Sequence, residues 1–387
     1  VLMVCFLFLI FISEQGKIAQ DLLKERIMQD NALSRWLSPL MAFCLSFIII
    51  ATLAPLVGIQ VERQLDFWLL WLVTMVILAL PVCYLEIALA KRSKTTALNA
   101  LSSLTRDADA SQTWRLVGWL AVVFIPFLAG GMLSNAAQLL NQYALADMTS
   151  SVIFIALAVV AIALSFAPRL LTLALTAVGM LISLVLANLS GTGIAEWQVT
   201  PVEFSEWGSA TVLALVANGL GLGLYWQNSL AQVQQQDAAS KTVLPIWIAQ
   251  IFAVVAFAFF AVQAALPTYA IALTAVAAAA VLLQMAREQL AQRQLNIVIQ
   301  WLVLLAATLV WLIPATGPIF NILLMLWGLV ICLIYAIFAG WIMKISHLRK
   351  SMNFSNEAFY NIWRIAVRVI LPVSIVLAIV AVVGKLI

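Results

Sequence analysis

The chain has 387 residues, of which 65% are hydrophobic and only 9% are charged, and its formal net charge is +4. Together with a mean hydropathy of +1.09, so few charges exclude a soluble globular domain and favour an integral membrane protein. The sequence contains no metal-ligand spacing, no phosphate-binding loop behind a strand and no Ser/His/Asp set. We therefore expect neither an enzyme nor a nucleic-acid-binding protein.

Residues 1–34 form an N-terminal segment that we separate from a transmembrane domain at 35–387. Its apolar run is shorter than the roughly 20 residues of a spanning helix, and it lacks the basic flank of a secretory signal. Lys24 and Glu25 can be encoded by AAG-GAG, a ribosome-binding sequence, shortly before Met28. We hypothesise that translation starts at Met28; native peptides from the residues before it, detected by mass spectrometry, would contradict this.

From residue 35 onward, apolar stretches of bilayer-crossing length follow one another with short polar breaks. If the N-terminus is inside, every Lys and Arg except Arg63 and Lys385 falls on the inner side. This asymmetry predicts a multi-pass protein of the cytoplasmic (inner) membrane with a cytoplasmic N-terminus and an outer C-terminus. The predicted spans are 37–59, 67–90, 116–143, 151–166, 169–188, 208–231, 243–266, 268–286, 295–314, 317–343 and 361–384.

The span predicted at 208–231 contains three glycines at alternate positions, Gly219, Gly221 and Gly223. Each glycine weakens a helix by about 1 kcal/mol relative to alanine, and an opened backbone in the bilayer must be covered by protein or line a water-filled cavity. The pattern fits two structures. One is a helix break whose free main-chain groups hold a solute or ion, and the other is a close approach of two helices.

Four segments, in the same order and spacing, resemble the second, sixth, tenth and eleventh helices of the neurotransmitter:sodium symporter family, whose members have the LeuT fold. The resemblance spans about residues 35–385. The residues that carry it are Pro81, Glu86, Lys91 and Arg92; Trp207 and the glycines of 219–223; Phe320, Asn321, Gly340 and Trp341; and Trp363, Arg364, Arg368 and Pro372.

The resemblance implies an all-α integral membrane protein in which helices 1–5 and 6–10 form two inverted repeats, with an eleventh helix outside them. It also implies a break at the glycines and a small organic solute at the bilayer midplane. Asn321 stands at the position of an outer gate. The candidate substrate-binding residues are Ser46, Gly130, Met132, Asn218, Gly219, Gly221 and Gly223.

Glu86 is the acidic residue that we place well within a span, where an ionisable group is a functional candidate. The resemblance implies that it props the opened backbone near the glycines through hydrogen bonds, and a proton relay is a further possibility. The alternative is an ordinary charge at the end of a helix, close to Lys91 and Arg92.

The sequence departs from the family where sodium and substrate ligands are expected. The expected sodium positions are Ala217, Ala277 and Ala278, and alanine methyls supply no oxygen, so we expect no metal or cofactor and doubt sodium coupling. The first helix lacks Gly and Asn, and its β-branched residues give it no reason to unwind. A tyrosine expected on the third helix is replaced at 130–133 by Gly-Gly-Met-Leu.

Two functional hypotheses follow. The first is a secondary transporter of a small organic solute, such as an amino acid, whose sodium and substrate motifs are eroded. The second is a transport-inactive scaffold or partner subunit that meets another membrane protein in the bilayer. The missing sodium and substrate ligands favour the second hypothesis, and the retained glycines favour the first.

Overall fold

The protein is an all-α, multi-pass membrane protein. Apart from turns and one isolated β-bridge between Gln64 and Gln198, the described part of the chain is helical. The N-terminal segment, with its hypothetical start at Met28, lies outside the described residues. The computed structural model describes residues 36–54, 56–57, 64–143, 145–190, 197–227, 239–258, 268–343, 345–354 and 356–384.

Seven helical segments are long and apolar enough to cross a membrane, judged by length and composition. They match seven of the predicted spans and are Trp36–Ala54, Leu65–Ser93, Gln112–Gln142, Arg169–Leu186, Ala270–Gln292, Gly317–Ile342 and Glu357–Gly384. The other four predicted spans contain shorter apolar helices: α6 (Ser150–Leu164), α8 (Phe204–Leu215), α10 (Ser240–Ala256) and α12 (Ile297–Leu309). The hairpin predicted around Pro267 lies outside the described residues.

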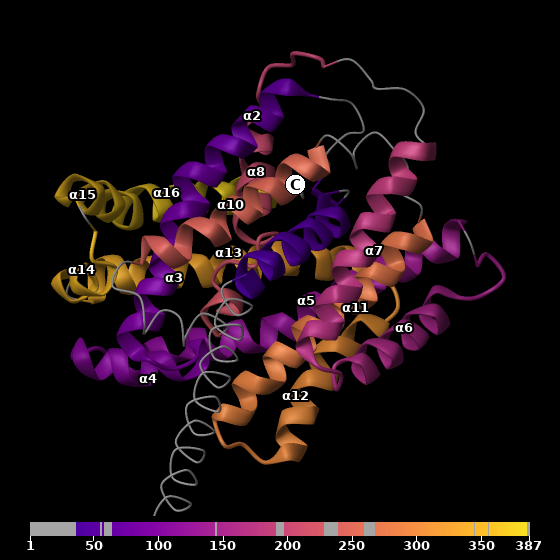
Figure 1. Ribbon diagram of the computed structural model, residues 1–387, viewed down its shortest axis with the longest axis horizontal. Helices are drawn as coiled ribbons and strands as arrows, with labels where there is room; N and C mark the ends of the chain where they lie inside the picture. The colour runs from indigo at the N-terminus through magenta and orange to yellow at the C-terminus, as the bar shows by residue number, and fades with distance from the viewer. Residues whose placement is uncertain are drawn as a thin grey trace, which may run out of the picture.

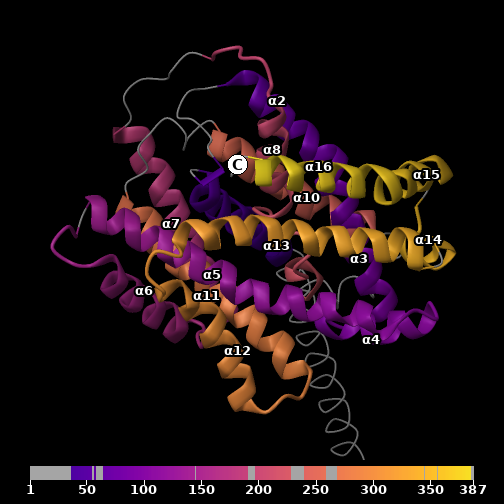
Figure 2. The same cartoon turned by 180° about the vertical axis from the view of Figure 1, so that it is seen from behind.

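Within the long segments the labelled elements of Figure 1 are α2 (Leu65–Thr74), α3 (Leu80–Ser93), α5 (Leu116–Tyr143), α7 (Arg169–Ser190), α11 (Thr268–Gln292), α13 (Gly317–Ile337), α15 (Glu357–Ile365) and α16 (Leu371–Gly384). The long helices α5 and α11 pack side by side through the middle of the molecule, and α7 packs on the other side of α11. Figure 2 shows α13 and α16 lying next to each other, and α16 also covers α8.

The described part of the chain contains three complete π-helical turns, and two of them precede a proline. Met75–Ala79 lies just before Pro81, and Ala366–Ile370 lies just before Pro372. A proline lacks the N–H of a regular helix, so carbonyls near it lose their helical partner. The carbonyl of Met75 accepts from the N–H of Leu80 within the π-helical turn and also from the indole N–H of Trp247, at 2.9 Å, and this second bond connects α10 to the second span.

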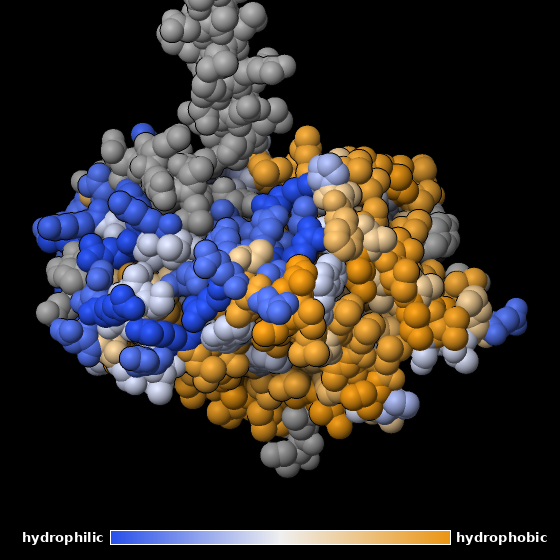
Figure 3. Space-filling model, turned by 90° about the horizontal axis from the view of Figure 1, so that it is seen from below, coloured by the Kyte–Doolittle hydropathy of each residue, from blue (hydrophilic) through white to orange (hydrophobic). Residues whose placement is uncertain are grey.

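Two amphipathic helices were not predicted, α4 (Ala97–Asp107) and α14 (Ile345–Met352). They pack on α5 and on α3 respectively. Ion pairs lie at the ends of these helices, between Arg92 and Asp107 and between Arg349 and Glu357, each at 2.9 Å. Figure 3, which views the molecule from below, shows hydrophilic residues gathered toward one end of the surface, while hydrophobic residues cover most of the remainder.

Candidate functional site

The sixth apolar stretch is broken at its glycines, the one of the two structures fitting their spacing that the family resemblance implies. The helix α8 ends at Leu215, and residues 216–223 form turns before a helical segment resumes at 224. The φ angles of Gly219, Gly221 and Gly223 are +64°, +80° and +71°. Residues with a side chain rarely adopt this region, so the three glycines are what permits the break.

The carboxylate of Glu86 holds the open backbone from α3. Its Oε1 accepts hydrogen bonds from the N–H of Gly221 at 2.8 Å and of Gly223 at 3.2 Å. Glu86 is only 3% exposed, so these two main-chain donors replace the water that the carboxylate loses.

The carbonyls that the break sets free are covered by side chains from other segments. The carbonyl of Asn218 accepts from the Tyr225 hydroxyl at 2.8 Å and from Gln250 Nε2 of α10 at 3.1 Å. The carbonyl of Leu220 accepts from Cys332 Sγ of α13 at 3.3 Å. These main-chain groups are thus satisfied within the protein, as the bilayer interior requires.

Buried oxygens beside the break are left over, among them ones on Asn218, Ser46 and Gln289. The Nδ2 of Asn218 caps α8 by donating to the carbonyls of Leu213 and Ala214 at 2.9 and 3.1 Å, but its Oδ1 is buried without a hydrogen-bond partner. The Ser46 hydroxyl neighbours the Tyr225 hydroxyl, yet it makes no well-formed hydrogen bond to a described residue. Buried polar atoms are normally paired, so these are atoms that a bound molecule or water would satisfy.

The flanks of the glycines are packed. A Cβ placed on Gly221 would lie 3.0 Å from Cys332 Sγ, and one placed on Gly223 would lie 2.4 Å from the Cβ of Ala97. A larger residue at either position would collide with α13 or α4.

The other predicted substrate and gate residues lie on α5 and α13. A Cβ on Gly130 would lie 2.6 Å from both the carbonyl of Thr308 and the Cδ1 of Trp311, so Gly130 packs against α12 and the turn after it. Met132 is buried on α5. Asn321 is half-buried on α13, and its Oδ1 has no hydrogen-bond partner among the described residues. The structure describes no contact between these three residues and the break.

The positions expected to bind sodium contribute only methyl groups. Ala217, Ala277 and Ala278 are buried. The neighbouring hydroxyl of Thr274 donates to the carbonyl of Ala270 in its own helix at 2.6 Å, so its proton is already engaged. The first span is helical throughout Trp36–Ala54, so it opens no carbonyls there.

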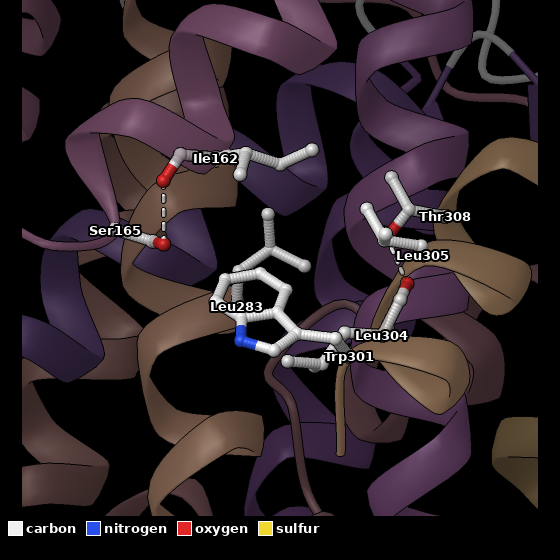
Figure 4. A pocket seen from close by; sticks show the side chains of 7 residues that line it. All are labelled: Ile162, Ser165, Leu283, Trp301, Leu304, Leu305 and Thr308. Carbon is white, nitrogen blue, oxygen red and sulfur yellow. Dashed lines mark hydrogen bonds between the residues drawn. The ribbon is translucent and has the colours of Figure 1, made fainter. Parts of the chain in front are cut away.

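A small void between α6, α11 and α12 is the pocket drawn in Figure 4. Its volume is about 10 Å³, which holds a single water at most. The hydroxyls of Ser165 and Thr308 on its rim donate to the carbonyls of Ile162 and Leu304 in their own helices, at 2.7 and 2.8 Å. We therefore do not regard this void as a solute site.

Sequence reasoning missed three residues that close the break. Tyr225 and Cys332 cover carbonyls, and Gln289 Nε2 of α11 lies 3.5 Å from the carbonyl of Leu222. The position of Tyr225, a hydroxyl-bearing residue two places after the last glycine, is the one signal that could have suggested its role. The other two come from distant helices, and their spacing in sequence carries no such signal.

The sequence matches no family model, and no curated protein matches it. Among solved structures, the chain is similar to MhsT, which was crystallised in complex with L-phenylalanine. The two chains share 14% sequence identity over 88% of this chain and 98% of that chain, with a TM-score of 0.49.

Proposed function

We propose that this protein is a secondary transporter of the LeuT type that moves a small organic solute by alternating access around the broken sixth helix. The break held by Glu86 carries this proposal. A buried carboxylate is costly in a bilayer, and a helix opened at three left-handed glycines gives up hydrogen bonds of its regular ladder. A helix that serves only to pack against its neighbours gains nothing from either.

The chemistry of the break indicates which end of a solute it would hold. The N–H groups of Gly221 and Gly223 already donate to the carboxylate of Glu86, so they are not free for a solute carboxylate. The unpartnered groups include Asn218 Oδ1, which can only accept, and the Ser46 hydroxyl. We therefore propose a solute that presents an N–H or O–H donor to the break, such as an amine or an amide.

A transport-inactive scaffold is the second candidate. Its supporting observation is that the carbonyls of Asn218 and Leu220 are covered by protein side chains. Such coverage leaves a stable break without a ligand. In this case the protein would act through another membrane protein.

Ser46→Ala separates the two candidates. Because the Ser46 hydroxyl has no well-formed bond, its removal should leave the thermal unfolding temperature of the solute-free protein unchanged. For a transporter, the variant should weaken the stabilisation that a solute from an amine and amide panel confers, and should slow uptake into proteoliposomes. The matched control is Ser183→Ala, since Ser183 is also buried in a spanning helix but bonds to the carbonyl of Gly179.

Two other results would contradict a transport site at the break. If no member of the panel stabilises the wild-type protein or enters the vesicles, and a stoichiometric membrane partner copurifies, the scaffold replaces the transporter. A solute effect that Ser46→Ala leaves intact would retain transport but move the site away from the break.

A further inference from the structure

A second and larger pocket lies where α5, α6 and the turn before α13 meet. Its volume is about 120 Å³, and none of the residues that line it is charged. Serine and glutamine side chains, an indole ring and the starts of two helices surround it. The residues that matter for its chemistry are Ser134, Gln138, Ser150, Ser151, Trp311 and Gly317.

Trp311 forms a rigid apolar wall of this pocket. Gly130 and Gly131 on α5 leave room for its indole, whose atoms would lie 2.6–2.8 Å from a Cβ at either position. The indole N–H donates to the carbonyl of Phe127 at 2.9 Å. The ring also contacts the rings of Phe127 and Phe320, at centroid distances of 5.1 and 5.4 Å. The orientation of the indole is therefore fixed before any ligand arrives.

The α5 wall changes from small to polar one turn beyond these glycines. Ser134 and Gln138 are four residues apart and so share one face of the helix, and both line the pocket. Ser134 is 8% exposed, and its hydroxyl is not hydrogen-bonded to any residue that the structure describes. The Ser134 hydroxyl therefore faces the pocket, where a bound molecule or water supplies its partner.

Two helices begin at the pocket. Ser150 is the first residue of α6 and Gly317 is the first residue of α13. The preceding residues, Thr149 and Thr316, give no side-chain cap to either helix. The first N–H groups of a helix have no partner within it, and they carry partial positive charge. Two uncapped helix starts therefore present donors to the same small space as Ser134.

We infer that this pocket binds a small organic monocarboxylate with a short apolar part. The carboxylate would accept hydrogen bonds from the serine hydroxyls, the Gln138 amide and the helix starts, while the apolar part would rest on Trp311. With donors and dipoles but no charged side chain in the lining, binding is weak and reversible. The pocket is separate from the break that follows α8, so this inference does not depend on the transport proposal.

A pair of isosteric probes tests this assignment on the full-length protein in lipid nanodiscs. Ligand-observed NMR titrations compare propionate with propionamide, which has the same shape without the charge. We expect saturable binding of propionate and at least about tenfold weaker binding of propionamide, as for charge-assisted relative to neutral hydrogen bonds. Ser134→Ala should weaken propionate binding about tenfold, whereas the control Ser183→Ala should not change it.

A second variant fills the pocket without touching Ser134. A Cβ on Gly317 would meet only Gln138 Nε2, at 3.7 Å, so Gly317→Val should fold normally, as its thermal unfolding checks, and should abolish propionate binding. Equal binding of the two probes, no binding of propionate, or propionate binding that survives both variants would overturn the inference. Inorganic phosphate that competes as well as an added monocarboxylate would replace the carboxylate site with a general anion site.

Discussion

The first and sixth spans occupy equivalent places in the two predicted repeats, yet they differ in the middle of the bilayer. Trp36–Ala54 is helical throughout, whereas the sixth span stops at Leu215 and resumes at 224. The first span has no glycine and carries three consecutive isoleucines, Ile48 to Ile50, while the sixth has three glycines with positive φ. The contrast teaches that backbone permissiveness, and not burial or position in the repeat, determines where the helix opens.

The largest expected effect comes from removing the group that holds the break. Glu86→Leu leaves the N–H groups of Gly221 and Gly223 buried without a partner, and we expect a loss of about 3 kcal/mol in the free energy of unfolding. Glu86→Gln keeps an acceptor oxygen and should cost only about 1 kcal/mol. Reversible unfolding in mixed micelles measures both. Equal losses for the two variants would mean that the hydrogen bonds of the carboxylate do not hold the break.

A side chain at the centre of the break should have the next largest effect. Gly221→Ala places a Cβ at φ +80° and 3.0 Å from Cys332 Sγ, and we expect a loss of about 2 kcal/mol. The control is Gly384→Ala, because a Cβ there meets nothing within 4 Å. The same unfolding assay applies. A Gly221→Ala protein as stable as the control would show that the left-handed turn is not needed.

Removing a side chain that covers a free carbonyl at the break should destabilise the protein less than a substitution at Gly221. Tyr225→Phe removes one of two donors to the carbonyl of Asn218 and leaves that of Gln250. The expected loss is therefore that of a single hydrogen bond, about 1 kcal/mol. In a double-mutant cycle with Gln250→Leu, the second loss should exceed the first, because the carbonyl then has no partner. Additive losses would contradict shared coverage of that carbonyl.

The smallest effect is expected in the continuous span. Ser46→Gly should cost about 1 kcal/mol relative to Ser46→Ala, the penalty for glycine within a helix. One glycine should not open this helix, since its neighbours retain their helical bonds. Hydrogen exchange of the amides around residue 46 checks this. Amide exchange as rapid as that at residues 216–223 would show that the first span opens in the same way as the sixth, contrary to its continuous helix.

How much of the fold could be predicted from the sequence depends on whether residues close together in the sequence carry the signal for each feature. The eleven apolar stretches and the break at the glycines follow from composition and from the φ angles that glycine permits. The partners of the break do not, because Gln250 and Cys332 lie on distant helices that only the tertiary fold brings to residues 218–220. The helices α4 and α14 were missed because their polar residues resemble loops when hydrophobicity is the only guide.

The residues of the candidate site could likewise be predicted only in part from the local sequence. Asn218 and the glycines lie within one local stretch of sequence, whereas Ser46, Gly130 and Asn321 were grouped with them only through a family pattern. In the structure Gly130 packs against Trp311, an aromatic partner that has no marker in the sequence. The roles of all these residues in solute binding stay predictions.

An experimental density map of the full-length protein in a lipid bilayer is the most direct test. We predict left-handed glycines at 219, 221 and 223, a Glu86 carboxylate within hydrogen-bonding distance of two main-chain N–H groups, and ordered density beside Asn218 Oδ1. Continuous helical hydrogen bonding from Leu215 through Gly223, with side chains filling the space beside Asn218, would contradict both the break and the transport function proposed for it.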